Sequence, residues 1–240
     1  MSAPAESAAK LGDGPAGIPQ PVLVRGTGLL GASIGIGLSA AGVDVRLHDP
    51  SPAALAVAAD IRAGRPARLD AEGDDLDVAP GLVVVAAPPD VTADVVVDSL
   101  RRWPAAVVVD IASVKEAVAA GVRAAVDDGR LAPQDADRYL GTHPMAGSER
   151  SGPVAARGTL FTQAPWVLCP TDTTHPGALA AGRALARTLQ ATPYRMAARA
   201  HDETVALISH LPQIAASLVA SRLQDTPVSY THLRAHETEA

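Results

Sequence analysis

The most constraining feature of the chain is a glycine pattern between a short apolar run and a helical stretch. Residues 22–24 form the apolar run, and Gly26, Gly28 and Gly31 follow it in the string VLVRGTGLLGASIG. In a G-x-G-x-x-G loop the first glycine makes a tight turn, the second lets the backbone approach a pyrophosphate, and the third lets the helix pack close to the strand. The amino terminus of that helix offers unpaired N–H groups to phosphates. The sequence therefore predicts the dinucleotide-binding corner of a Rossmann-type fold.

An acid after the next apolar run supports this prediction. Residues 43–47 have the pattern of a second strand, and Asp49 follows it. A carboxylate there accepts hydrogen bonds from both ribose hydroxyls and repels a 2′-phosphate, which favours NAD over NADP. Arg46 and His48 could soften that preference, and the alternative is a turn that binds nothing, with Asp49 capping the next helix. The residues expected to contact NAD here are Gly26, Gly28, Leu29, Leu30, Gly31 and Asp49.

The rest of the chain alternates short β-branched runs with Ala-rich helical stretches, the pattern of a parallel sheet with crossover helices. Strands are expected at 22–24, 43–47, 82–86, 107–109, 139–141 and 166–169. Helices are expected at 29–41, 51–63, 91–101, 114–128 and 177–190. The predicted fold class is α/β, a doubly wound parallel sheet over residues 21–196, followed by the start of an all-helical domain over 197–224.

The two ends of the chain differ from the rest in composition. Residues 1–20 lack the basic start and apolar run of a signal peptide, so a floppy leader is expected. Residues 225–240, DTPVSYTHLRAHETEA, have no apolar periodicity and are expected to be foreign to the natural protein. The helical domain would then be incomplete.

Composition excludes several classes of protein. The formal net charge is −6 and no cluster of Lys and Arg is visible, which argues against a nucleic-acid partner. No apolar stretch reaches the roughly 18 residues of a membrane span. Cys169 is the one cysteine and lies in an apolar run, so it is expected to be a buried strand residue in a reducing cytoplasm. No metal site is expected.

Candidate site residues follow the later predicted strands, at the edge of the sheet where Rossmann ligands lie. Ala87 and Pro88 end one strand and either bend the chain beside the cofactor or only terminate the strand. Ser113 follows the next strand in the string DIASVK, and His143 follows a third in a Gly/Pro-rich loop. An imidazole titrates near neutrality, so His143 is a candidate acid or base, although a structural histidine is the alternative.

The order of six strings resembles that of the prephenate/arogenate dehydrogenases of tyrosine biosynthesis. The matching strings are GTGLLGASIG, SVK at 113–115, HPMAGSERSG at 143–152, Leu160-Phe161 before WVLCP at 166–170, His201-Asp202, and SHLPQ at 209–213. They cover about residues 22–223, and the HPMAGxExSG string is long and specific. The resemblance implies a cytoplasmic, homodimeric, NAD-dependent oxidoreductase.

The reaction implied is the oxidative decarboxylation of prephenate to 4-hydroxyphenylpyruvate, or of arogenate to tyrosine. The C4 hydrogen of the ring leaves as hydride to the nicotinamide while the carboxyl group departs as CO2. His143 corresponds to the family's catalytic histidine, which must be neutral to accept a hydrogen bond from the C4 hydroxyl. Activity is therefore expected to fall as the pH drops below the pKa of this histidine. Ser113 corresponds to a serine between nicotinamide and substrate that orients both.

The resemblance also assigns the remaining candidates. Glu149 corresponds to an acid near the mouth of the site, with a plain surface carboxylate as the alternative. His210 and Gln213 would face the substrate from the helical domain, although some relatives have a second histidine where Gln213 stands. His201 is expected at the surface or at a domain junction. Lys115 is expected to serve structure at a helix start, although its closeness to Ser113 leaves a role in the site open. Relatives continue with further helices that hold the dimer interface and an arginine for a substrate carboxylate. Residues 225–240 do not supply these, so NAD binding is expected to exceed turnover.

Two other functions stay open at this point. Another Rossmann oxidoreductase, of the β-hydroxyacid dehydrogenase or ketopantoate reductase type, would place a catalytic lysine on the helical domain, and residues 198–223 contain no Lys. A non-catalytic NAD-sensing module would keep the glycine loop and Asp49 but would need neither His143 nor Ser113. The choice between prephenate and arogenate also stays open.

Overall fold

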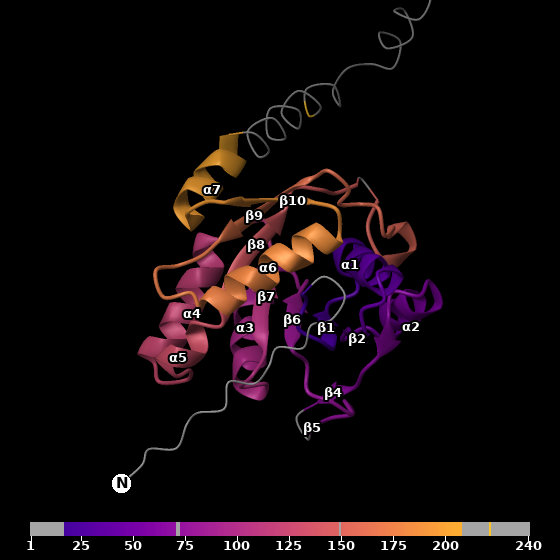
Figure 1. The fold of residues 1–240 in the computed structure, drawn as a ribbon, viewed down its shortest axis with the longest axis horizontal. Helices are drawn as coiled ribbons and strands as arrows, with labels where there is room; N and C mark the ends of the chain where they lie inside the picture. The colour runs from indigo at the N-terminus through magenta and orange to yellow at the C-terminus, as the bar shows by residue number, and fades with distance from the viewer. Residues whose placement is uncertain (1–16, 71–72, 149, 208–220, 222–240) are drawn as a thin grey trace, which may run out of the picture. The chain divides into compact units, whose positions relative to one another are not determined.

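The computed structural model describes residues 17–70, 73–148, 150–207 and 221 (Figure 1). The chain divides into two compact units, and the boundary between them falls between His201 and Asp202. The first unit contains the sheet, its helices and the candidate site, and it is the unit described below.

The first unit is built on a twisted sheet whose strand order reverses in the middle. From one edge to the other the described strands are β10 (Thr192–Arg195), β9 (Pro165–Cys169), β8 (Tyr139–Pro144), β7 (Val107–Asp110), β6 (Leu82–Val85), β1 (Val22–Arg25), β2 (Val45–His48) and β3 (Arg65–Pro66). Strands β6, β1 and β2 lie side by side within it (Figure 1). The chain moves outward in one direction from β1 to β3 and in the other from β6 to β8. This reversal confirms the predicted doubly wound Rossmann fold, and it places a ligand crevice beyond the carboxyl ends of β1 and β6.

Helices cover both faces of this sheet because the central strands are apolar on both sides. Along β1, Val22 and Val24 pack into one core layer and Leu23 packs into the other. The first layer is closed by α1 (Leu29–Ala40), α2 (Pro52–Asp60) and α6 (Pro176–Thr188). The second is closed by α3 (Pro89–Arg102), α4 (Glu116–Asp127) and the short α5 (Pro133–Ala136). A 3-10 turn, η1 (Pro153–Ala155), a hairpin of β4 (Leu69–Asp70) and β5 (Gly73–Asp74), and α7 (Ala198–Val205) complete the described elements.

The direction of β9 differs from the prediction of an all-parallel sheet. β9 pairs antiparallel with β8, with Thr142 opposite Leu168. A parallel connection needs a crossover element, usually a helix, but the described part of the segment between β8 and β9 contains only the three-residue η1. The chain therefore doubles back without crossing a face of the sheet, and β10 then pairs parallel with β9 after α6.

The predicted floppy leader, residues 1–20, extends too far along the chain. Ile18 is fully buried in the core, and the side chain of Gln20 accepts a hydrogen bond from the backbone N–H of Asp44. Residues 17–20 are therefore part of the packed domain, because Ile18 lies in its core and Gln20 is bonded to Asp44, just before β2. Residues 1–16, most of 197–224 and all of 225–240 lie outside the described residues, so the predictions about them stay predictions.

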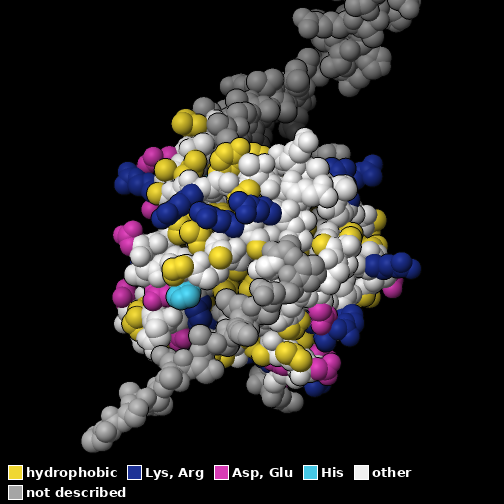
Figure 2. Space-filling model, viewed as in Figure 1, with side chains coloured by type: hydrophobic (Ala, Val, Ile, Leu, Met, Phe, Trp, Pro, Cys, Tyr) yellow, Lys and Arg dark blue, Asp and Glu magenta, His cyan; other side chains and the backbone are white. Residues whose placement is uncertain are grey.

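The surface and interior of the described part carry three further findings. Cys169 is a buried strand residue, as predicted. Figure 2 shows a short row of Arg side chains, interspersed with apolar ones, on the face that α6 covers; α6 itself carries exposed Arg183 and Arg187. Within the described ranges, no helix is both long and apolar enough to cross a membrane.

Candidate active site

The glycine loop between β1 and α1 has two glycines that the fold itself requires. Gly26 has φ 105°, and a Cβ there would overlap the carbonyl of Ala86 on the neighbouring strand. A Cβ on Gly31 would overlap the carbonyl oxygen of Gly26. Gly28 is different, because a Cβ there would meet nothing within 4 Å. The open space at Gly28 therefore faces outward, where a ligand can approach the backbone.

The amino terminus of α1 is prepared for an anion. Its N-cap is Gly28, no side chain caps the helix, and the first turn contains no acidic residue. The first N–H groups of a helix have no partner within the helix, and the macrodipole makes this end positive. A negatively charged group is therefore favoured at this terminus.

Asp49 connects the second strand to the glycine loop. Its Oδ2 accepts hydrogen bonds from the backbone N–H of Thr27 at 2.6 Å and from the Thr27 hydroxyl at 2.9 Å. Its Oδ1 accepts one from the backbone N–H of Ser51 at 2.8 Å, and the Ser51 hydroxyl in turn caps α2. A carboxylate offers about four lone-pair sites. Asp49 is thus held firmly at the loop and keeps acceptor capacity for a ribose hydroxyl.

A cavity of about 480 Å³ lies beside this loop, at the point where the strand order reverses. Its lining includes five of the predicted cofactor residues: Gly26, Gly28, Asp49, Ala87 and Pro88. It also includes five residues that were not among the predicted site residues: Arg25, His48, Pro50, Val91 and Val95. Leu29 and Leu30 are half-buried and pack against the core instead of lining the cavity.

Charge in this cavity is mostly compensated. Arg25 forms an ion pair with Asp98 at 2.6 Å and donates to the hydroxyl of Ser99. Burial, together with the charge of Arg25, lowers the pKa of His48 below its ordinary value, although the carbonyl of Ala67 and the charge of Asp49 act in the opposite direction. His48 is therefore neutral at neutral pH. Arg46, which could have favoured a 2′-phosphate, pairs instead with Asp44 and Asp77.

The two predicted catalytic residues lie at the same edge of neighbouring strands. β7 and β8 run parallel with Asp110 opposite Gly141; Ser113 follows the first strand, and His143 lies near the end of the second. Ser113 is exposed and His143 is half-buried. Both therefore lie at the carboxyl edge of the sheet, the same edge as the cavity beside the glycine loop.

His143 contacts a second histidine that the sequence placed elsewhere. Nδ1 of His143 lies 2.9 Å from Nε2 of His201, and the two rings meet edge to face with centroids 5.1 Å apart. His201 is 1% exposed, so the prediction of a surface position is wrong, although the boundary between the two compact units does fall directly after it. No local pattern reveals the contact, because α7 is brought to β8 only by the tertiary fold.

A buried ionic network holds the ends of β7 and β8 together beneath this edge. Lys115 is 1% exposed; it forms an ion pair with Asp110 and donates to the carbonyl oxygen of Thr142 at 2.6 Å. The Tyr139 hydroxyl donates to Asp110 at 2.7 Å, and burial together with this carboxylate raises the pKa of Tyr139 well above its ordinary value. Lys115 thus has the structural role expected of it, between the residues that carry Ser113 and His143.

Three predicted site residues lie outside the described residues. They are Glu149, His210 and Gln213. Their assignment as substrate-binding residues therefore stays a prediction.

A protein-family model, the nucleotide-binding domain of prephenate dehydrogenase, matches residues 36–194 of the chain. This segment is more than half of the chain and carries the acid after β2, Ser113 and His143. The chain belongs to the prephenate dehydrogenase family.

Two curated members of the prephenate dehydrogenase family are similar to the chain, one over most of it and one over about a third of it. A protein of Streptomyces niveus named as a probable prephenate dehydrogenase, NovF, is 38% identical over 203 residues, which are 85% of this chain and 52% of the relative. The prephenate dehydrogenase of Bacillus subtilis is 40% identical over 83 residues, 34% of this chain and 22% of the relative. The chain thus spans about half the length, or less, of these curated relatives.

Solved structures of the same family share the fold. The arogenate dehydrogenase of Synechocystis matches with a TM-score of 0.70 at 28% identity, covering 88% of this chain and 72% of that one. The prephenate dehydrogenase of Aquifex aeolicus, solved with hydroxyphenyl propionate and NAD+, matches with a TM-score of 0.74 at 22% identity, covering 87% and 71%. A 3-hydroxyacyl-CoA dehydrogenase of Archaeoglobus fulgidus matches with a lower TM-score of 0.54 at 18% identity, a likeness of fold alone.

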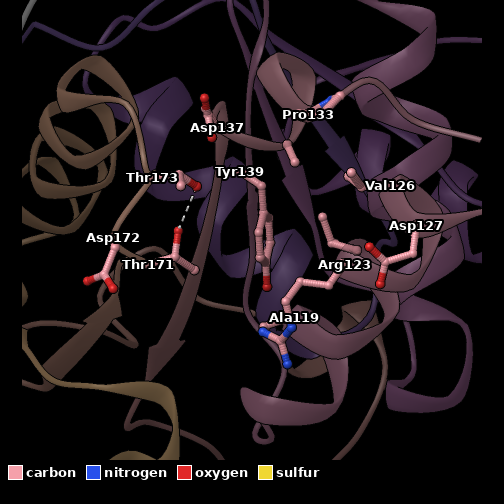
Figure 3. A pocket seen from close by; sticks show the side chains of 12 residues that line it. Ala119, Arg123, Val126, Asp127, Pro133, Asp137, Tyr139, Thr171, Asp172 and Thr173 are labelled. Carbon is pink, nitrogen blue, oxygen red and sulfur yellow. Dashed lines mark hydrogen bonds between the residues drawn. The ribbon is translucent and has the colours of Figure 1, made fainter. Parts of the chain in front are cut away.

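A second cavity, of about 420 Å³, lies away from the residues that mark the family site. It is bounded by α4, α5 and the loop after β9, and the ring of Tyr139 stands in its centre with Arg123, Asp127 and Asp172 around it (Figure 3). The charged side chains at its rim are exposed except Asp137, which is half-buried, and the buried Tyr139 hydroxyl is already bonded to Asp110. It contains none of the predicted site residues, so the carboxyl edge of the sheet is the candidate active site.

Proposed function

We propose that this chain carries the nucleotide-binding and hydride-transfer part of a prephenate or arogenate dehydrogenase. The reaction is the NAD-dependent oxidative decarboxylation of a cyclohexadienol in tyrosine biosynthesis. The observation that carries the proposal is the shared edge of the sheet: the nucleotide cavity, Ser113 and His143 all lie at the carboxyl ends of adjacent strands. Membership of the prephenate dehydrogenase family supports it.

The residues of the cavity suit NAD. Gly28 leaves room for a pyrophosphate against the uncapped amino terminus of α1. Asp49 retains an acceptor site for a ribose hydroxyl, and its negative charge opposes a 2′-phosphate. When bound, NAD supplies the acceptor for the hydride that leaves the substrate ring.

The protein's own contribution is to position the ring and to take up one proton. Nδ1 of His143 is engaged by His201, so the C4 hydroxyl of the substrate meets Nε2 of His143. As the C4 hydrogen leaves as hydride, this hydroxyl becomes a carbonyl and its proton passes to Nε2. The ring carboxyl group leaves as CO2, and its bonding electrons pass through the ring to the C4 oxygen. The ring is then aromatic, and the C4 oxygen takes back the proton from Nε2 to become the phenol of the product. Ser113, exposed at the neighbouring strand end, orients substrate and nicotinamide.

The test is an NADH absorbance assay with prephenate and with arogenate. It is run on this chain and on a chimera in which the remaining carboxyl-terminal region of the Streptomyces niveus relative is attached. NADH formation with either substrate is expected, and the preferred substrate is read directly from the two rates. If neither protein forms NADH with either substrate while NAD still binds, the proposal of a dehydrogenase fails and an NAD-sensing module replaces it.

The matched variants are His143→Asn and His175→Asn. His143→Asn should bind NAD normally and lose turnover by about 10²-fold or more, the usual contribution of a positioned acid or base. His175 is exposed and caps α6, and asparagine is a good capping residue, so His175→Asn should leave both properties unchanged. A His143→Asn protein with full turnover would remove that residue from the mechanism.

The oligomeric state and location of the complete enzyme are part of the same proposal. We propose a homodimer in the cytoplasm; the chain has a single cysteine, the buried Cys169, which fits a reducing compartment. Light scattering on the chimera should give the mass of a dimer, whereas a monomeric mass at working concentration would contradict this part.

A further inference from the structure

We infer that His201 is a positioning residue that fixes the tautomer of the catalytic imidazole. The inference rests on the proposed function, because it concerns how His143 is made ready to take a proton. Its basis is the 2.9 Å contact between Nδ1 of His143 and Nε2 of His201. His201 is not among the residues to which the sequence gives a role in the site.

The contact allows only two arrangements of hydrogen between neutral rings. Either Nδ1 of His143 donates to Nε2 of His201, or Nε2 of His201 donates to Nδ1 of His143. In the first arrangement Nε2 of His143 carries a lone pair, and in the second it carries a hydrogen. Only a lone pair at Nε2 can accept the proton of a substrate hydroxyl. The proposed reaction therefore requires the first arrangement, in which His201 is the acceptor.

This arrangement has to be imposed, because an isolated histidine side chain favours the hydrogen at Nε2. We assign the acceptor role to Nε2 of His201, whose ring is held in place opposite Nδ1 of His143. The side chain is 1% exposed, and the backbone N–H of His201 is bonded to the carbonyl of Ala197 at the start of α7. A buried ring nitrogen left without its hydrogen bond is costly, so the buried pair strongly favours a state in which one hydrogen lies between the two nitrogens.

The same bond contributes more once the reaction has begun. Between neutral rings it is an ordinary hydrogen bond. When Nε2 of His143 takes the hydroxyl proton, the ring becomes a cation and its Nδ1–H a charged donor, and such bonds are about twice as strong as neutral ones. An interaction that strengthens toward the transition state raises kcat, whereas one of constant strength would mainly change KM. His201 thus has the role toward His143 that the aspartate of a Ser-His-Asp triad has toward its histidine: it accepts the Nδ1–H bond and sets the tautomer. Unlike that aspartate, it does so as a neutral ring.

The test is nitrogen NMR of the full chain with ¹⁵N-labelled histidine. The His143 signals are assigned by their loss in His143→Asn. We expect Nδ1 of His143 to be the hydrogen-bearing, pyrrole-type nitrogen and Nε2 the pyridine-type nitrogen. The reverse pattern in the wild-type protein overturns the inference, and this result needs no variant that must fold and no turnover.

Two substitutions at His201 then separate positioning from packing. His201→Leu fills a similar space without an acceptor and should move the His143 ring toward the Nε2–H tautomer. His201→Gln retains an amide oxygen that can accept from Nδ1 and should restore the wild-type pattern. An unchanged tautomer in a folded His201→Leu protein overturns the inference. His175→Gln, at an exposed cap, is the control and should leave the His143 signals in place.

The kinetic readout is the division of the effect between kcat and KM. In whichever protein turns over substrate, this chain or the chimera, His201→Leu should lower kcat by about 10²-fold and leave the KM for NAD unchanged. This is within the usual range for the loss of a correctly positioned acid or base. His201→Gln should recover most of that loss. Equal losses in both variants overturn the inference. If the wild-type enzyme shows no turnover at all, the proposed function fails, whereas the tautomer of His143 still decides the inference about His201.

Discussion

Single residues beneath the site are joined through one buried carboxylate. Asp110 pairs with Lys115, accepts from the Tyr139 hydroxyl, and receives the backbone N–H of Ala112 at 2.9 Å. The hydroxyl of Thr142 donates to the Asp110 carbonyl at 2.6 Å. The bonds of Tyr139 and Thr142 cross from β7 to β8, and those of Ala112 and Lys115 hold the segment that follows β7. Together they fix the strand ends that carry Ser113 and His143.

Tyr139→Phe tests this network at one atom. The change leaves the ring in place and removes the donor to Asp110, so a buried carboxylate oxygen loses a partner. The free energy of unfolding should fall by about 1–3 kcal/mol, measured by urea denaturation. Tyr194→Phe is the matched control, because Tyr194 is 52% exposed on β10 and the same change there should have little effect. Equal losses in the two variants would show that the Asp110 bond adds nothing.

His48 gives a prediction about pH. Burial lowers its pKa in the folded chain, so the fold prefers the neutral ring while the unfolded chain binds a proton below a pKa near 6.5. The stability from this residue is therefore present above that value and is lost as the pH falls through it toward the lower folded pKa. Urea unfolding from pH 8 to pH 5.5 should show a decline that His48→Asn reduces. His175→Asn should leave the decline as it is, and an unaltered slope in His48→Asn would contradict the prediction.

The predicted site residues show what sequence can and cannot locate. The sequence predicted Gly26, Gly28 and Asp49 beside the cofactor cavity because dinucleotide binding requires these residue types at this local spacing. Arg25 and Val91 lie in the same cavity without any such signal, because the order of strands in the sheet brings them there. The contact of His201 with His143 could not be predicted for the same reason, since the two residues lie far apart in the sequence.

At the scale of elements, buried apolar runs and Ala-rich helices were predictable, and short or exposed elements were not. The central strands are apolar on both faces, and the structure places them within a few residues of the predicted bounds. β3 is only two residues long, and β10 is largely exposed and contains Pro193, so neither has a periodic pattern. The direction of β9 could not be read either, because it depends on the short η1 connection and not on the strand's own residues.

The junction of β1 and α1 gives a prediction that separates folding from binding. Gly31→Ala places a methyl group against the Gly26 carbonyl and should cost about 1–3 kcal/mol of unfolding free energy through overpacking. Gly28→Ala meets open space and should leave stability nearly unchanged, but its methyl group enters the place proposed for the pyrophosphate. NAD affinity of Gly28→Ala should fall by about tenfold or more, the effect of roughly 1.4 kcal/mol. Calorimetric titration and urea unfolding of both variants measure the two effects, and normal NAD binding by Gly28→Ala would refute the placement.

At the scale of the whole sheet domain, the segment from β8 to β9 connects the two parts of the proposed site. One part is the glycine loop with α1, proposed to bind the nucleotide, and the other contains His143, proposed to meet the substrate. This segment runs from His143 back across α1, where the backbone N–H of Arg157 donates to the Ser33 hydroxyl at 3.0 Å. Gly158 packs directly against Gly37, and a Cβ on Gly158 would lie 3.0 Å from Ile36. The helix whose first turn is proposed to bind the pyrophosphate therefore also supports the segment that follows His143, the proposed catalytic histidine.

Binding at the start of α1 should consequently stabilise residues 150–160. We expect NAD to slow amide hydrogen exchange in this segment, because local opening there must separate it from a helix that the nucleotide holds in place. α5, on the opposite face of the sheet, should show no comparable change. Gly158→Val should separate the segment from α1, lower stability by about 1–3 kcal/mol, and abolish the protection while NAD still binds. If NAD protects α5 and residues 150–160 alike, the effect is a general stabilisation of the domain, and α1 does not specifically couple the two halves of the site.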